Sequence, residues 1–287
     1  MPARTSIQRT SYTSYIDVIL SATHVRWKIM SRYPGYTLIE IVLPLITTAL
    51  PLLLGGSLQG SASGIRAFAK NAGTIQYQAY LLLGSITLLL VSSTLRSVAL
   101  WIYREQYIGT LEATYMAPVP HACLLLGVAL YSNIRSLITL SISFIAGCIL
   151  FKIDPFQGNI PLALSFLAFG TIALYGMSLL FGAIILRFKE ANAILQIAQW
   201  LVILLMGAYF PIQVFPPSLR WIALASPPTW MINGTRAALL NTSWFSGSWY
   251  GDLLIMMLFA IITPLIGHAI FIRLEKNLRA HQGLGTF

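Results

Sequence analysis

Charged side chains are scarce in this chain of 287 residues, and their scarcity excludes a soluble domain. Asp, Glu, Lys and Arg make up 9% of the residues, whereas roughly a quarter is usual for a soluble domain. Hydrophobic residues make up 57%, and the mean hydropathy is +0.76. The net charge of +10 does not indicate a nucleic-acid partner, because the basic residues are scattered between apolar runs. The composition predicts an integral membrane protein.

Sequence patterns for several kinds of chemistry are also missing. There is no Gly-x-x-x-x-Gly-Lys-Ser/Thr loop, so we do not expect this chain to bind nucleotide phosphates. The four histidines are dispersed and form no metal-ligand pattern. No carboxylate lies near the middle of an apolar run, where a proton-driven transporter or an intramembrane enzyme would usually need one. We therefore expect no catalytic residue, no metal site and no cofactor on this chain.

Six apolar runs are long enough to cross about 30 Å of hydrocarbon. They lie near Tyr36–Gly55, Gln76–Leu100, Cys123–Phe151, Pro161–Leu186, Ala191–Phe210 and Tyr250–Ile272. We expect an all-α integral membrane protein with one six-span domain over residues 36–275 and a tail over residues 276–287. An even number of spans places both termini on the same side of the membrane.

The distribution of Lys and Arg predicts which side that is. The termini and the even-numbered connections hold most of the 18 basic residues. The opposite connections hold Arg66, Lys70, Lys152, Arg220 and Arg236. Because basic residues concentrate in the cytoplasmic loops of membrane proteins, both termini are predicted to be cytoplasmic.

The N-terminal segment, residues 1–35, is predicted to contain an amphipathic helix. Polar and apolar residues form two helical stripes over residues 16–30, and Arg26, Lys28 and Arg32 favour an anionic lipid surface. No apolar core with a cleavage site is present, so we expect no signal peptide. A helix on the cytoplasmic membrane surface is the favoured interpretation, and contact with a soluble subunit is the alternative.

Three charged residues fall inside the expected spans. Glu40 and Arg96 lie at similar depth near the cytoplasmic ends of the first and second spans, which predicts a structural ion pair. Arg135 lies about three turns into the third span. Its side chain either extends toward the membrane surface or faces a cavity, where it would contact an anionic lipid or substrate.

The connection between the second and third spans, residues 104–118, carries charge in a chain with little of it. It contains Arg104, Glu105, Gly109, Thr110, Glu112 and Pro118. Glu105 and Glu112 are seven residues apart, so one helix would place both on the same face, beside an apolar stripe that includes Ile108 and Leu111. A short amphipathic helix on the membrane surface is expected, and a solvated loop is the alternative.

The longest outer connection, residues 211–249, is too apolar for a free loop. Its marker residues are Pro211, Pro217, Trp221, Pro227, Trp230 and Arg236. Two proline-bounded pieces, Leu219–Leu224 and Thr229–Leu240, are too short to span and are predicted to form a re-entrant helical hairpin in the outer leaflet. Trp221 and Trp230 are interpreted as part of an interfacial aromatic belt, with substrate stacking as the alternative.

Two of these stretches resemble one family. Glu105, followed by Gly109-Thr110-Leu111-Glu112 and Pro118, is similar to the cytoplasmic coupling segment of type-2 ABC transporter permeases. The prolines between Phe210 and Arg236 resemble the re-entrant outer element of the same family. The resemblance implies a permease of a bacterial or archaeal ABC exporter in the cell membrane. It further implies a dimer, with a second copy or a paralogue, and two separate cytoplasmic ATPase subunits that bind ATP and Mg²⁺.

The resemblance to this family does not determine which substrate is transported. Type-2 permeases handle drugs, lipids, lipid-linked glycans and polysaccharides, and the aromatic-rich outer region favours an amphiphile or a glycan over an ion. The alternative of a different class is a membrane-embedded lipid-modifying enzyme, such as a prenyl or acyl transferase. Paired Asp motifs or a His-Asp pair would favour that enzyme, and the sequence contains neither. A membrane scaffold without transport activity is the third interpretation.

Overall fold

The computed structural model describes residues 15–58, 68–116, 121–152, 158–187 and 191–281, and regular structure in these ranges is entirely helical. The elements are α1 Tyr15–Met30, α2 Pro34–Leu58, α4 Tyr77–Ile108, α5 Leu111–Met116, α6 His121–Phe151, α7 Ile160–Arg187, α8 Ala191–Leu205, the 3-10 turn η2 Ile212–Val214, α9 Pro217–Leu224, α10 Pro227–Leu240 and α11 Trp249–His281. The prediction of an all-α protein is confirmed.

Within the described ranges, four helices are long and apolar enough to cross a membrane: α4, α6, α7 and residues 249–277 of α11. They correspond to the second, third, fourth and sixth predicted spans. The first predicted span falls in α2, whose apolar stretch is shorter, Thr37–Ala49. The fifth falls in α8, whose 15 residues extend about 22 Å at 1.5 Å per residue. The count of six spans therefore stays a prediction.

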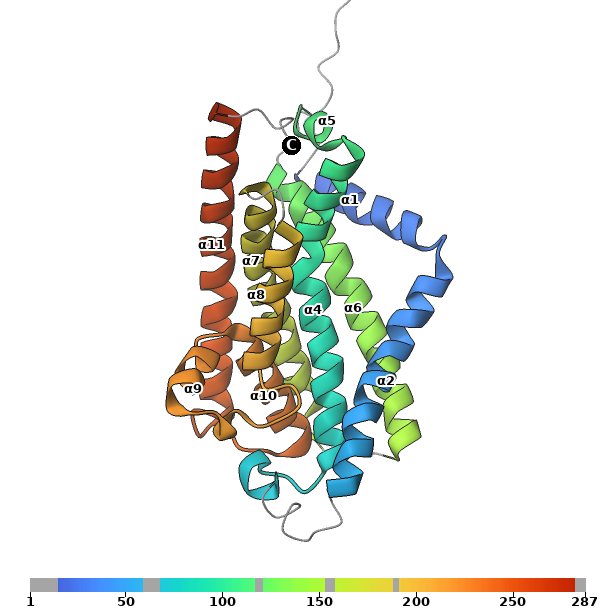
Figure 1. Cartoon of the computed structure of the whole chain (residues 1–287), viewed down its shortest axis with the longest axis vertical. Helices are drawn as coiled ribbons and strands as arrows, with labels where there is room; N and C mark the ends of the chain where they lie inside the picture. The colour runs from blue at the N-terminus through green and yellow to red at the C-terminus, as the bar shows by residue number, and fades with distance from the viewer. Residues whose placement is uncertain (1–14, 59–67, 117–120, 153–157, 188–190, 282–287) are drawn as a thin grey trace, which may run out of the picture.

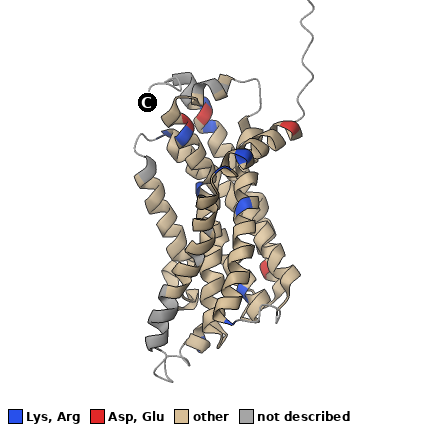
Figure 2. Ribbon diagram, turned by 90° about the vertical axis from the view of Figure 1, so that its right-hand side faces the viewer, with Lys and Arg blue, Asp and Glu red and all other residues tan. Residues whose placement is uncertain are grey.

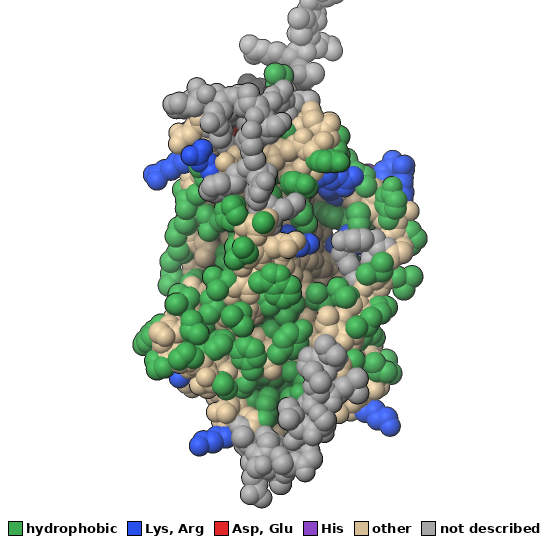
Figure 3. Space-filling model, viewed as in Figure 1, with side chains coloured by type: hydrophobic (Ala, Val, Ile, Leu, Met, Phe, Trp, Pro, Cys, Tyr) green, Lys and Arg blue, Asp and Glu red, His purple; other side chains and the backbone are tan. Residues whose placement is uncertain are grey.

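The bundle has two different ends (Figure 1). One end carries α1, α5 and the last turns of α11, and we call it the α5 end. The other carries α9 and α10, and we call it the α10 end. Acidic and basic residues are concentrated toward the α5 end (Figure 2). Hydrophobic side chains cover most of the middle of the face in Figure 3, with Lys and Arg above and below, as expected for a bundle surrounded by hydrocarbon.

Helix α7 forms the centre of the bundle and packs against α11, α4 and α10. Its side chains Phe166, Leu174 and Leu179 are at most 1% exposed. The backbones of α7 and α11 approach closely at two glycines, because a Cβ on Gly267 would collide with the Gly176 carbonyl oxygen. Small residues at such crossings let membrane helices pack closely.

Replacing Gly267 with alanine is therefore expected to destabilise the bundle by about 1–3 kcal/mol, because the added methyl group meets backbone that cannot rotate away. The matched control is Gly35→Ala, since a Cβ on Gly35 has no atom within 4 Å. SDS-induced unfolding of the detergent-solubilised protein, followed by circular dichroism, measures both variants. Equal midpoints for the two would contradict the close packing of α7 and α11.

Candidate functional site

The predicted coupling segment contains a sharp turn at Gly109. Helix α4 ends there, and Gly109 has φ 77°, in the left-handed region that glycine adopts without steric cost. The Gly109 N–H donates to the Gln106 carbonyl at 3.1 Å, and the Thr110 N–H donates to the Glu105 carbonyl at 3.0 Å. This pair of bonds is a Schellman cap, which closes a helix. Helix α5 follows as a separate element (Figure 1).

The turn makes the prediction of one helix over residues 104–118 wrong. Seven-residue spacing aligns Glu105 with Glu112 only in a continuous helix, and the left-handed glycine interrupts it. The predicted apolar stripe is divided in the same way, because Ile108 is 56% exposed whereas Leu111 is 2% exposed and packs in the main core. Leu111 therefore anchors the turn to the bundle.

Glu105 connects this turn to α1. Its Oε1 lies 3.7 Å from Nη2 of Arg26, and its Oε2 accepts a 2.6 Å hydrogen bond from the Thr110 hydroxyl. Burial lowers the pKa of Arg26, and the nearby Glu105 carboxylate opposes that shift. The ion pair is about four-fifths buried, so it is less screened than a surface pair. The turn and α1 are thus held together.

Helix α1 also packs directly on α6. The Thr23 hydroxyl donates to the Gly127 carbonyl at 3.0 Å, and the Trp27 ring meets Tyr131 edge to face. A Cβ on Gly127 would lie 2.7 Å from the Cβ of Ala22, so this contact depends on the missing side chain. The sequence predicted a helix attached to lipid, and the structure adds an attachment to the bundle.

Three apolar side chains project from the coupling turn. Tyr107 is 85% exposed, Ile108 is 56% exposed and Met116 is 83% exposed. We call these three residues the coupling patch. The ring of Tyr107 stacks on that of Tyr103, with the centroids 6.5 Å apart. The sequence analysis missed Tyr107 and Met116, because their exposure follows from the direction of the turn and not from any spacing. Exposed apolar side chains at such a place mark a contact with a partner protein or with the membrane.

The buried guanidinium of Arg236 joins three elements at the α10 end. It belongs to α10 and is 3% exposed. Its Nη1 donates to the Gly207 carbonyl at 2.8 Å, and its Nη2 donates to the carbonyls of Tyr80, at 3.1 Å, and Ala208. The guanidinium also lies over the Tyr80 ring, 3.5 Å from its centroid. Helix α8 ends at Leu205, so the carbonyls of Gly207 and Ala208 have no partner within that helix, and Arg236 satisfies them. We call this arrangement the Arg236 clamp.

The two proline-bounded pieces predicted near the clamp are helical in the structure, as α9 and α10, and their re-entrant position in the outer leaflet stays a prediction. Pro217 opens α9, and Pro227 opens α10, where a missing N–H has no cost. Trp221 is 75% exposed, in agreement with an interfacial belt. Trp230 is 8% exposed, and its Nε1 donates to the Leu224 carbonyl at 2.7 Å. Its interpretation as a belt residue is therefore wrong, since a buried indole with a satisfied N–H is a core residue.

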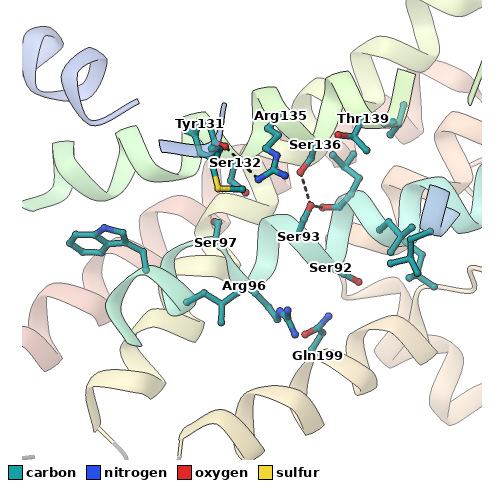
Figure 4. Close-up of a pocket in the computed structure, with 18 of the residues that line it drawn as sticks. Ser92, Ser93, Arg96, Ser97, Tyr131, Ser132, Arg135, Ser136, Thr139 and Gln199 are labelled. Carbon is teal, nitrogen blue, oxygen red and sulfur yellow. Dashed lines mark hydrogen bonds between the residues drawn. The ribbon is translucent and has the colours of Figure 1, made fainter. Parts of the chain in front are cut away.

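A cavity of about 930 Å³ is lined by α1, α2, α4, α6 and α8. Its polar wall comes from two copies of the pattern Ser-x-x-Arg-Ser, at residues 93–97 on α4 and 132–136 on α6. The copies face each other, because the hydroxyls of Ser93 and Ser136 share a 2.7 Å hydrogen bond (Figure 4). This bond brings Arg96 and Arg135 to one cavity. The repeated pattern is visible in the sequence and could have indicated that the two arginines belong to one site, but it was not among the predicted features.

The ABC-2 type transporter family model matches residues 18–240, which is most of the chain. The chain belongs to the ABC-2 type transporter family. The match extends from α1 to the end of α10 and includes the coupling turn, the cavity and the Arg236 clamp. Comparison with curated proteins gave no match. This ABC-2 permease is thus a multi-pass membrane component of an ABC transporter, and its family associates with an ABC ATPase subunit.

Some residues predicted for the permease's function lie outside the described part of the structure. They are the side chains of Glu40 and Glu112 and the whole of Pro118. The ion pair of Glu40 with Arg96 stays a prediction, as does the role of Glu112. Arg135, for which the sequence left two interpretations open, lines the cavity.

Proposed function

We propose that this ABC-2 permease is the membrane part of an ATP-driven exporter and that its coupling turn docks on a separate ATPase subunit. The observation that carries the proposal is the coupling patch, which is apolar and exposed on a turn anchored by Leu111 and Glu105. An interface core of this kind is enriched in aromatic residues and Met. ATP and Mg²⁺ bind to the ATPase subunit in this proposal.

Helix α4 supplies the mechanical link. It runs without a break from Tyr77 to Ile108, so it passes from the α10 end, along the cavity, to the coupling turn. Closure of two ATPase subunits on ATP would displace the turn together with α1. A continuous helix transmits that displacement to Arg96 in the cavity wall and to Tyr80 in the Arg236 clamp. The cavity would open alternately to the two sides of the membrane.

The transport path is proposed to form between two permeases. Helix α8 borders the cavity, and its Ile197, Trp200 and Leu201 are more than half exposed. A second copy or a paralogue that covers this side would enclose the two cavities in one path. The family match favours transport over the lipid-modifying enzyme considered from the sequence.

The membrane is proposed to be the cell membrane of a bacterium or an archaeon, with both termini in the cytoplasm. The α5 end carries Arg26, Lys28, Arg32, Arg104, Arg187, Arg273 and Lys276. The basic residues described at the α10 end are fewer, which supports a cytoplasmic α5 end.

Cysteine labelling tests this orientation. In a variant that lacks Cys123 and Cys148, a cysteine at Met116 should resist a membrane-impermeant maleimide in intact cells, and one at Asn71 should react. Both should react after the membrane is permeabilised. Labelling of Met116 from outside would reverse the orientation and remove the ATPase docking proposal.

The export function is tested by co-expressing this permease with a candidate ABC ATPase subunit from the same organism. The two proteins should purify as one complex from co-expressing cells, and ATP hydrolysis by the reconstituted complex should exceed that of the ATPase alone. Failure of the ATPase to bind the permease would contradict the proposed function.

A further inference from the structure

The described residues that line the cavity beside α4 include four arginines and no acidic residue. Arg96 and Arg135 lie in the wall, and Arg26 and Arg104 also line the cavity. Glu105 offsets Arg26 at 3.7 Å, whereas no described side chain forms an ion pair with Arg96. A concave wall of low dielectric constant concentrates the potential of such charges. The lining therefore favours an anionic ligand.

Hydroxyl groups surround the two arginines. Within each Ser-x-x-Arg-Ser pattern the two serines are four residues apart and share one face of their helix, and both serines and the arginine line the cavity. Figure 4 shows Arg96 directed toward Gln199 of α8, and Arg135 on the opposite wall beside Ser132. Guanidinium groups bind two phosphate oxygens at once, and hydroxyls donate to the others. Paired arginines among serines suit a phosphate group.

The position of these groups is fixed by contacts between α4 and α6. Besides the Ser93–Ser136 bond, the Thr94 hydroxyl donates to the Asn133 side-chain oxygen at 3.0 Å. The arginine-bearing turns are thus held beside each other by contacts within the protein. Groups held in place before binding lose little freedom when a ligand arrives.

The remaining wall of the cavity is apolar. It includes Ile86, Leu88, Leu140, Trp200 and Ile203. Trp200 is 67% exposed, so the apolar wall continues to the outer surface of the bundle. The volume of about 930 Å³ lies near the upper end of ordinary ligand sites. The cavity can therefore hold a polar headgroup at the arginines while an apolar tail follows α8 toward the lipid.

We propose that this cavity binds an amphiphile with an anionic, phosphate-type headgroup and that such amphiphiles are the exported substrates. This inference rests on the proposed export function and names its substrate class. The headgroup lies between Arg96 and Arg135, and the tail contacts the α8 side. A resident anionic membrane lipid has the same chemistry, so the experiment must separate a transported ligand from a bound lipid.

Binding is measured with the full chain in phosphatidylcholine nanodiscs. A fluorescent short-chain phosphatidic acid should bind at least about tenfold more tightly than a diacylglycerol with the same tails, since charged hydrogen bonds to the headgroup are lost without the phosphate. Arg96→Gln or Arg135→Gln should reduce this preference about tenfold, and the Lys variants should retain most of it. Arg220→Gln is the control, because Arg220 is exposed on α9. Equal binding of the two probes by the unmodified chain would overturn the proposal.

Transport is measured with the permease–ATPase complex in liposomes that contain the fluorescent phosphatidic acid. ATP should change the fraction of probe that dithionite reduces from outside, and Arg135→Gln should abolish that change. If the complex hydrolyses ATP and binds the probe without moving it, the ligand is a resident lipid and the substrate assignment fails. If the ATPase does not bind the permease, the export function fails, and the nanodisc measurement still decides whether the cavity prefers phosphate.

Discussion

Replacing Arg236 with methionine is expected to lower the free energy of unfolding by about 3–5 kcal/mol, the largest effect anticipated for any single substitution in this protein. Methionine fills most of the space but donates no hydrogen bond. The carbonyls of Tyr80, Gly207 and Ala208 would then lose the donor that satisfies them in a buried site. The contact of the guanidinium with the Tyr80 ring would also be lost.

SDS-induced unfolding of the solubilised permease measures this loss. The unfolding midpoint of Arg236→Lys should lie between those of Arg236→Met and the unmodified chain. The ammonium group of lysine is a point charge and lacks the planar fork of a guanidinium. Arg220→Met is the matched control on the neighbouring helix α9, where Arg220 is exposed. An unfolding midpoint for Arg236→Met equal to that of Arg220→Met would show that the clamp contributes nothing to stability.

Replacing Tyr107 with alanine is expected to weaken ATPase binding by about 2–4 kcal/mol, which is about 30-fold or more, because exposed aromatic anchors dominate protein interfaces. Tyr107 is 85% exposed, so its loss leaves the permease fold unchanged. Met116→Asp should act in the same direction by placing a charge in an apolar contact. Permease-stimulated ATP hydrolysis and transport should fall together, while the cavity keeps its ligand affinity.

Trp221 offers the matched control for this prediction. It is 75% exposed at the opposite end of the bundle, so Trp221→Ala removes an equally exposed aromatic ring away from the proposed interface. Size-exclusion chromatography of the complex and titration of the ATPase compare the two variants. Weaker ATPase binding in Trp221→Ala than in Tyr107→Ala would move the docking surface to the other end.

The Gly109 turn tests the same interface through the backbone. Gly109 has open space around it, so a larger side chain there meets no neighbour and acts through its left-handed φ of 77°. Gly109→Val should shift the coupling turn and reduce ATPase stimulation, because a β-branched residue strains this conformation. Gly109→Asn should retain more of it, since asparagine tolerates the left-handed region. Equal loss in both variants would point to bulk in the interface instead.

Long, strongly patterned features of this protein were predictable from the sequence. Apolar runs predicted the four helices that are long and apolar enough to cross a membrane, and the prolines at 217 and 227 predicted α9 and α10, because both signals are local. The contacts of Arg236 were not predictable. Its partners Tyr80 and Gly207 lie 156 and 29 residues away, and no spacing rule connects a buried arginine to backbone carbonyls.

In the coupling segment, a prediction made from local sequence was wrong. The sequence predicted one helix that runs through Gly109, whereas the Schellman cap uses the left-handed backbone of Gly109 to end α4. One residue therefore decided whether Glu105 and Glu112 share a face. The Ser-x-x-Arg-Ser repeat was visible in the sequence, but its meaning depended on α4 and α6 packing side by side.

The central claim is that the coupling patch contacts an ABC ATPase, and site-specific photo-crosslinking tests it most directly. Benzoylphenylalanine would replace Tyr107, Met116 or Trp221 in the full chain, in cells that contain the ATPase. The account predicts that illumination joins the chains carrying it at Tyr107 or Met116 to a protein with a Walker nucleotide-binding loop, identified by mass spectrometry, and that Trp221 gives no such product. Absence of the product at both Tyr107 and Met116, in cells where the ATPase co-purifies with the permease, would contradict the account.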